Sequence, residues 1–472
     1  MMPSIKELFI EYLKGRSADG SGKPQSYAKA MQVIEDVLFD ERFSESFSIW
    51  EFVNDKNVDK IYEYVRIQQN LDDGIFKNYE PKSYWKKNYC SAALKEFKEY
   101  LSVTLEANIE PHHIDDCNAT EFTYDSNNAG LIFSEQVSSR LISSLLAKPF
   151  AILTGLSGSG KTKLAEAFSL WICEKDNQIC IVSVGADWTN REPLLGFPNS
   201  LKEGYYVKPD SGVLDLLIEA QKEENKDRPY FLILDEMNMS HVERYFADFL
   251  SAMESVSGEI ALHPDTDDWE GCDVPATIKL PKNLFIIGTV NIDETTYMFS
   301  PKVLDRANVI EFRVSENEMK SYFTQPTELD LDSLKGKGVS MAESFVAKSY
   351  EKGLMTQGLE KKLIPFFTEL QKVGAEFGYR TASEISRFVK ICEDMKGGTM
   401  KKNEIIDAAI IQKLLPKLHG SRSKIEKVLK ILISLCETDD ESKSVKYTLS
   451  HEKLNRMHQR IISDGFTSFA EA

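Results

Sequence analysis

The chain has 472 residues, of which 42% are hydrophobic and 28% charged, and its formal net charge is −17. A chain of this length is too long for a single hydrophobic core of ordinary size, so we expect two or three domains. The negative charge disfavours a protein that coats nucleic acid through bulk electrostatic attraction, although a local basic surface could still bind it.

The sequence predicts a cytoplasmic protein. No apolar run approaches the roughly 18 residues that a membrane-spanning helix needs, and residues 1–16 lack the apolar core of a signal peptide. The seven cysteines form no C-x-x-C pair and are interpreted as reduced thiols. We therefore expect no membrane partner.

A small all-α domain is predicted over residues 1–103. Ser4 and Glu7 form an S-x-x-E capping box, and helical apolar spacing recurs over 27–39, 58–69 and 84–101. Residues 77–89 interleave lysines with aromatic residues, as in surfaces that bind phosphates and stacked bases, but a packed aromatic core with solvated lysines has the same composition. Residues 104–128 are acidic with little periodicity and are predicted to be a linker.

An α/β domain is predicted over residues 129–315, and its first motif is a phosphate-binding loop. Residues 155–162 read GLSGSGKT, directly after an apolar strand and before a segment with helical spacing. Successive backbone N–H groups and the helix N-terminus then face the phosphates, Lys161 reaches the β- and γ-phosphates, and the Thr162 hydroxyl ligates Mg²⁺. The predicted nucleotide-binding residues are Gly155, Leu156, Ser157, Gly158, Ser159, Gly160, Lys161, Thr162 and Lys163.

A second apolar strand, at 230–234, ends in Asp235 and Glu236. Carboxylates at the carboxyl ends of parallel strands lie where open α/β sheets bind ligands. Asp235 is predicted to hold Mg²⁺, and Glu236 is predicted to orient or deprotonate the attacking water.

Two further polar residues follow in this domain. Asn291 ends the apolar strand 283–290 and is predicted to contact the γ-phosphate or the attacking water. Arg306, before the strand at 308–312, is a candidate for stabilising transition-state charge from its own or a neighbouring subunit. An ion pair with Asp305 is the alternative for Arg306.

Residues 316–472 are predicted to form a helical lid and a C-terminal helical region. Helical spacing recurs over 359–377, 381–395, 402–418 and 425–436. Arg380 lies at a junction between two of these helices. It is predicted to reach back to the nucleotide, with an interhelical salt bridge as the alternative.

Together, residues 155–162, 232–238, 288–291 and 304–306 resemble the AAA+ module of the McrB family, the nucleotide-hydrolysing motor subunits of modification-dependent restriction systems. The resemblance covers roughly residues 130–435. It implies an AAA+ P-loop NTPase fold with a helical lid, and a homo-oligomeric ring, a hexamer, in which Arg306 acts across the subunit interface. It also implies Mg²⁺ as cofactor, GTP as substrate, a McrC-like nuclease subunit as partner, and DNA, modified or not, as target.

The sequence departs from this family at two points. The family signature M-N-x-x-D appears here as residues 290–294, VNIDE, and a single arginine stands at the Asp305-Arg306 position. No N-K-x-D guanine-reading motif is present, so the residues leave GTP and ATP open. No nuclease motif is legible either, so DNA cleavage would require the partner. A MoxR-like AAA+ ATPase that remodels proteins is the alternative.

Overall fold

The computed structural model describes the chain except for residues 1–4, 17–21, 43–48, 53–57, 72–73, 78, 80–86, 108–117, 203, 265–268, 270–271, 293–296, 315, 317–318, 321–322, 324–327, 352–355, 396–399 and 439–443. The contacts divide it into two compact units, residues 1–113 and 114–472. Each unit is described by itself.

The described part of the first unit is helical. Its helices are α1 (Ile5–Gly15), α2 (Lys23–Arg42), α3 (Ile49–Phe52), α4 (Val58–Gln68) and α6 (Tyr89–Ala107). Their apolar faces meet in one core, in which the Phe9 ring packs edge-on against Phe97 at 4.9 Å between ring centroids. Most of the lysine–aromatic segment at 77–89 lies outside the described residues, and Lys87 and Tyr89 are exposed.

The prediction that residues 104–128 form a linker is wrong where the structure describes them. Residues up to 107 continue α6, and Ala119–Asn128 form helix α7, with Asn118 as the N-cap. Phe122 is fully buried and packs edge-on against Phe168 at 5.2 Å. The sequence did not predict this helix because few of its residues are apolar, so its helical spacing is weak. Its buried side chains pack against other segments of the second unit, which the local sequence does not show.

The second unit is built on a five-stranded sheet in which every pairing is parallel, in the order β2-β5-β8-β1-β9. The strands are β1 (Phe150–Gly155), β2 (Ile179–Ser183), β5 (Tyr230–Asp235), β8 (Leu284–Asn291) and β9 (Asn308–Glu311). Strand β8 separates β1 from β5, so the strand ending in Asn291 lies between the glycine-rich loop and the two acids. An α/β fold with a parallel sheet, as predicted, is confirmed.

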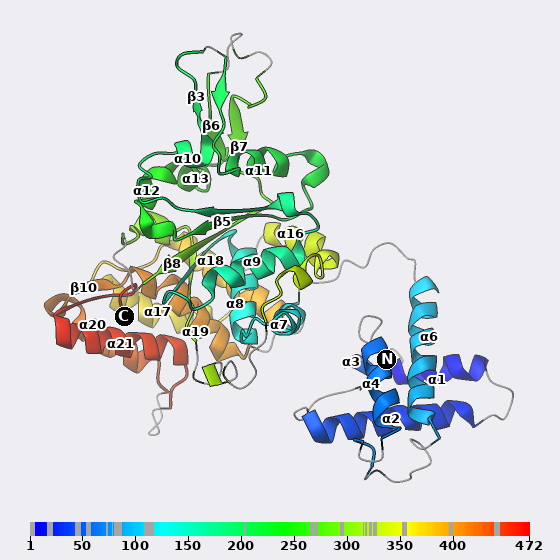
Figure 1. Ribbon diagram of the computed structural model, residues 1–472. Coiled ribbons are helices and arrows are strands. Elements are labelled where there is room, and N and C mark those ends of the chain that lie inside the picture. Colours follow the sequence, from blue (N-terminus) through cyan, green and yellow to red (C-terminus); the bar gives the residue numbers. More distant parts are fainter. Residues whose placement is uncertain are drawn as a thin grey trace. The chain divides into compact units, whose positions relative to one another are not determined.

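Helices cover both faces of this sheet (Figure 1). Alternate strand residues point to opposite faces, as Ile152 and Leu153 do in β1. One face packs on α11 (Val213–Ala220), α12 (Val242–Tyr245) and α13 (Ala247–Ala252), with α10 (Glu192–Leu195) nearby. The other face packs on α7, α8 (Glu135–Ala147), α9 (Lys161–Ile172) and α16 (Ala342–Tyr350).

Short elements connect these layers. The 3-10 turns are η1 (Asp176–Gln178), η2 (Glu223–Asn225), η3 (Met237–Met239), η5 (Asp332–Leu334) and η6 (Val339–Met341), and α14 (Pro301–Leu304) precedes β9. Two antiparallel pairs, β3 (Phe197–Pro198) with β4 (Tyr206–Val207) and β6 (Glu259–Ala261) with β7 (Thr277–Lys279), project from the top of this unit in Figure 1.

The carboxyl-terminal part forms a separate core of helices against Ala147 and Val309. It contains α17 (Leu359–Gln371), α18 (Tyr379–Asp394), α19 (Lys402–Lys413), η7 (Leu415–Lys417), α20 (Arg422–Leu435) and α21 (Thr448–Asp464). It also contains a short antiparallel pair, β10 (His419–Ser421) with β11 (Phe466–Ser468), which the prediction of a purely helical region missed. Residues 330–350 pack instead against α9 and the face of the sheet that α9 covers. The separate helical core therefore begins near Leu359.

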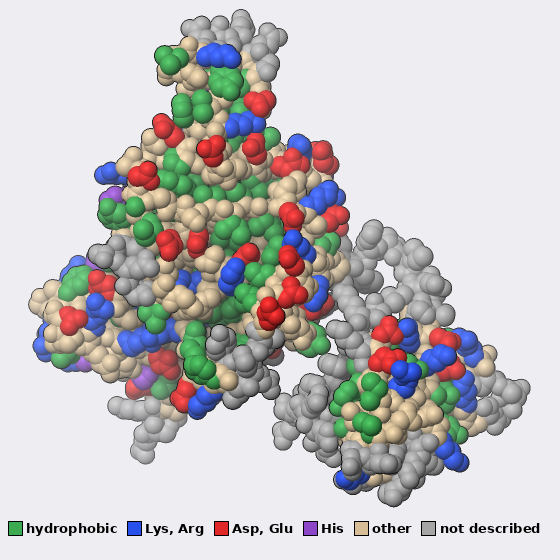
Figure 2. All heavy atoms as spheres, viewed as in Figure 1, with side chains coloured by type: hydrophobic (Ala, Val, Ile, Leu, Met, Phe, Trp, Pro, Cys, Tyr) green, Lys and Arg blue, Asp and Glu red, His purple; other side chains and the backbone are tan. Residues whose placement is uncertain are grey.

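Among the described residues, no helix combines the length and the apolar character needed to cross a membrane. On the face of the second unit in Figure 2, acidic and basic side chains are interspersed.

Candidate nucleotide-binding site

The glycine-rich loop joins the carboxyl end of β1 to the amino end of α9. Gly158 and Gly160 have φ angles of 72° and 97°, a left-handed conformation that glycine adopts without steric cost. Lys161 is buried, and its ammonium group donates to the carbonyls of Gly155 at 3.0 Å and Leu156 at 2.6 Å. The loop therefore closes around a cation at the N-terminus of a helix, an arrangement suited to phosphate oxygens.

The loop residues do not all face the same way. Leu156 is exposed, and Lys163 points along α9 to an ion pair with Glu166 at 2.8 Å. The carboxylate and hydroxyl groups expected around Mg²⁺ do meet, because the Thr162 hydroxyl donates to Asp235 Oδ1 at 2.7 Å. A hydroxyl and a carboxylate at this separation fit a hard divalent cation such as Mg²⁺.

Glu236 holds a strained backbone conformation directly after β5. Its φ angle is 53°, in the left-handed region that a residue with a side chain rarely adopts. The next turn, η3, packs on β8 at Gly288, where an added Cβ would lie 2.5 Å from the sulfur of Met237. This close packing turns the chain at Glu236 and helps to place its carboxylate at the edge of the sheet beside Asn291.

Asn291 reaches the same point from β8. It pairs in register with Gly155 on β1, and its side-chain amide donates to Glu236 Oε1 at 3.2 Å. Asp293 and Glu294, which follow Asn291, lie outside the described residues. The predicted site residues from three strands, Lys161 with Thr162, Asp235 with Glu236, and Asn291, are thus brought together.

Thr289 is a site residue that the sequence analysis missed. Its hydroxyl donates to Asp235 Oδ1 at 2.6 Å and accepts from the Glu236 backbone N–H at 3.0 Å. It is buried, so this one hydroxyl fixes both acids. Its alternation with Asn291 on β8 was a usable signal, but a threonine in an apolar strand is also common for its β-propensity alone.

The structure places neither Arg306 nor Arg380 among the hydrogen bonds that join the loop, the acids and Asn291. Arg306 does not pair with Asp305; its Nη2 group forms an ion pair with Glu254, and its Nε donates to the Leu250 carbonyl at 2.9 Å. Arg380 donates to the other oxygen of Glu254 at 2.9 Å. Arg380 thus forms a salt bridge between helical segments, which was the alternative for this residue, and its contact with the nucleotide stays a prediction.

Lysines from the end of α8 and from the helical core hold the segment around Arg306. Lys148 donates to the Asp305 carbonyl at 3.1 Å, Lys413 donates to the Ala307 carbonyl at 3.0 Å, and Lys417 pairs with the Asp305 carboxylate. Burial, and after it the nearby Lys413 charge, lower the pKa of Lys148 to about 8. Both lysines also pair with Glu384 on α18, so the segment is clamped from two sides.

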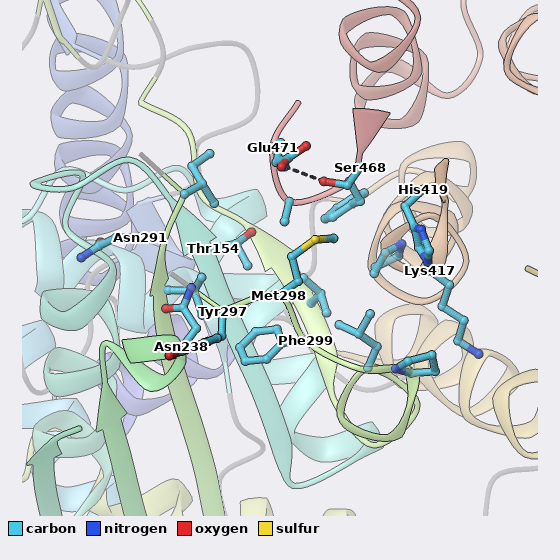
Figure 3. Close-up of a pocket in the computed structure, with 18 residues that line it drawn as sticks. Thr154, Asn238, Asn291, Tyr297, Met298, Phe299, Lys417, His419, Ser468 and Glu471 are labelled. Carbon is cyan, nitrogen blue, oxygen red and sulfur yellow. Dashed lines mark hydrogen bonds between the residues drawn. The ribbon is translucent and has the colours of Figure 1, made fainter. Parts of the chain in front are cut away.

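A cavity of about 260 Å³ lies beside Asn291. In Figure 3, Asn291 and Asn238 stand on one side of it, and Lys417, His419 and Ser468 of the carboxyl-terminal segment stand on the other. Most of its wall is apolar, with Met298 and Phe299 among the lining residues. The carboxyl-terminal segment and the residues around Asn291 thus line opposite sides of one mostly apolar cavity.

Residues 330–466 match the family described as "Domain of unknown function (DUF8727)". The match begins at Asp330, whose backbone N–H donates to the Ala129 carbonyl at 2.9 Å, and it ends at the first residue of β11. No curated protein matches the chain. The matched part thus covers the helical core and α16, and leaves out the glycine-rich loop and both acids.

Proposed function

We propose that the chain is a Mg²⁺-dependent nucleoside triphosphatase of the AAA+ class, the motor subunit of a McrB-type restriction system. The observation that carries this proposal is the convergence of three strand ends, where Thr162 and Asp235 lie 2.7 Å apart and Asn291 bonds Glu236 at 3.2 Å. The insertion of β8 between β1 and β5 supports it, because this order puts a sensing amide between the phosphate loop and the catalytic acid.

Each residue then has a role in phosphoryl transfer. Lys161 and the loop N–H groups bind the β- and γ-phosphates. Thr162 and Asp235 would hold Mg²⁺, which when bound neutralises charge on the phosphate oxygens. Glu236 accepts a proton from the attacking water or orients it, while Asn291 fixes the Glu236 carboxylate.

The two arginines support an oligomeric enzyme. Arg306 and Arg380 share one carboxylate, and the segment of Arg306 is tied to Lys148, which lies just before β1, whereas the phosphate loop follows β1. The two arginines therefore lie toward the opposite end of the sheet from their own loop. An arginine in this position would act on the nucleotide of a neighbouring subunit, which requires a ring or another closed assembly.

The test is turnover of GTP and of ATP by the purified protein with Mg²⁺, each with and without a McrC-like nuclease subunit. GTP turnover that the nuclease subunit stimulates would support the restriction-motor proposal. Turnover of ATP alone, indifferent to that subunit, would favour a MoxR-like remodelling ATPase. No turnover under any of these conditions would contradict the proposal that the chain is an NTPase.

The Glu236→Gln variant tests the catalytic assignment. It keeps the size of the side chain and removes its basicity, so nucleotide binding should persist while turnover falls by roughly 10²–10⁴-fold. The exposed Glu360 on α17, which lies outside the site, provides the matched control Glu360→Gln. Near-normal turnover by Glu236→Gln would remove Glu236 from the mechanism.

A further inference from the structure

A single carboxylate, that of Glu254, connects the two arginines. Glu254 follows α13, and its Oε1 accepts from Arg380 Nη1 at 2.9 Å while its Oε2 pairs with Arg306 Nη2. Arg306 comes from the turn before β9, and Arg380 from the first turn of α18 in the helical core. Glu254 therefore joins three segments that are far apart in the sequence.

The two arginines differ in how they are held. The Arg306 side chain is 10% exposed, and its Nε and Nη1 groups donate to the carbonyls of Leu250 and Lys302 at 2.9 and 2.6 Å. The Arg380 side chain is 43% exposed, and its other close carboxylate, Glu384, is 4.0 Å away. Arg306 is thus anchored inside the subunit, whereas Arg380 keeps donor groups available at the surface.

Arg380 borders a cavity whose charged lining residues are mainly basic. The cavity holds about 1180 Å³, near the residues that precede β1 and β8. Its charged lining residues are Lys148, Lys226, Lys279, Lys282, Arg380 and Arg387, against Glu223, Asp227 and Glu384. In a chain of net charge −17, such a local excess of cations suits an anionic ligand such as a triphosphate.

We infer that Glu254 is a positioning residue, anchored by Arg306, that orients the Arg380 guanidinium toward the triphosphate bound by a second copy of this chain. This inference rests on the proposed function and assigns Arg380, the more exposed arginine, to the contact between subunits. An arginine with four flexible side-chain torsions loses less entropy on binding phosphate when a carboxylate already fixes its planar group. Arg306 serves as the buried support of Glu254.

The first test compares Glu254→Gln with wild type under conditions in which the wild type is assembled and hydrolyses nucleotide. Loss of the charge should lower kcat by about tenfold or more, because Arg380 is then less ordered at the transition state. Binding of a fluorescent nucleotide to the isolated subunit should stay unchanged, since Glu254 makes none of the hydrogen bonds of the phosphate loop. Glu254→Asp keeps the charge and should restore part of the loss. Glu360→Gln, at an exposed residue of α17 outside this cavity, should match wild type.

A double-mutant cycle separates positioning from a merely structural effect. If Glu254 acts through Arg380, Glu254→Gln should lower kcat in wild type and cause no further loss in the Arg380→Ala background. A loss of equal size in both backgrounds, accompanied by a lower Tm, would overturn the inference in favour of a structural role. Turnover of Glu254→Gln equal to or above wild type would also overturn it, and would leave the proposed NTPase intact. Absence of turnover in the wild type itself would instead remove the proposed function, and this inference with it.

Discussion

The Thr289 hydroxyl shows how one atom can organise the acidic site. It bridges the Asp235 carboxylate and the Glu236 backbone, and it stands two residues before Asn291 on the same face of β8. Because the strand is buried, each of these hydrogen bonds lies where water competes poorly.

Thr289→Val tests this role at the scale of the residue. The change keeps the shape of the side chain but removes the donor to Asp235 and the acceptor for Glu236. We expect Mg²⁺-dependent turnover to fall by about 10–100-fold, with a cost of about 1–3 kcal/mol in stability from the unsatisfied groups. Steady-state kinetics over a Mg²⁺ titration and chemical denaturation would measure both.

Val290 alternates with Thr289 to the opposite face of the sheet and provides the matched control. Val290→Ile changes the same strand by one methylene group without touching a hydrogen bond, and should retain near-normal turnover. Equal activity of Thr289→Val and wild type would mean that the backbone alone positions the two acids.

At the scale of the element, helix α7 stabilises the second unit although its sequence is polar. Phe122→Ala removes a ring that packs against Phe168 and Trp171 and should lower the free energy of unfolding by about 3–5 kcal/mol. Tyr124, 54% exposed on the same helix, is the control, and Tyr124→Ala should cost far less. Denaturant unfolding of both variants would measure the difference, and similar values would contradict the burial of α7.

Helix α21 is fixed to the edge strand β9 by a buried ion pair. Lys453 donates to Glu311 at 3.0 Å, and Arg456 binds both oxygens of Glu311 at 2.9 Å. Burial lowers the pKa of Lys453 to about 8, although the Glu311 charge acts in the opposite direction. Because this pKa is lower than in the unfolded chain, the unfolded state binds more protons between about pH 8 and 10.5.

The free energy of unfolding should therefore rise with pH across this window in wild type relative to Lys453→Met. The slope of the difference is at most about 1.4 kcal/mol per pH unit. In the variant, Arg456 still pairs with Glu311, so the buried carboxylate keeps an ion-pair partner. Parallel denaturation curves of the two proteins at pH 8, 9 and 10 measure the slope, and a difference that does not change with pH would show that Lys453 titrates normally.

At the scale of the whole molecule, the division into units 1–113 and 114–472 predicts separable activities. All the residues proposed for hydrolysis belong to the second unit, so a protein comprising residues 114–472 should retain nucleotide binding and basal turnover within about twofold of the full chain. Fluorescent nucleotide binding and steady-state kinetics would measure this. A shortened protein that folds, as judged by circular dichroism, but binds no nucleotide would show that the first unit completes the site.

The sequence alone determined the local chemistry of this protein. The glycine spacing at 155–162, the apolar run ending in Asp235 and Glu236, and the run ending in Asn291 predicted a parallel α/β sheet with these groups at strand ends, because short-range spacing encodes strand, loop and helix directly. The structure joins these residues as expected. Helix α7 was not predicted because its few apolar residues are buried by contact with α8 and α9 and give no periodic signal within α7.

Only the tertiary structure decided the contacts between distant segments. The bridging role of Thr289 depends on the order of strands in the sheet, and the placement of Arg306 and Arg380 on Glu254 depends on packing between α13, α14 and α18. An arginine can extend several ångströms toward any of several carboxylates, so its neighbours in sequence do not fix its partner. The tertiary structure determines which carboxylate each arginine binds, because it brings Glu254 between Arg306 and Arg380.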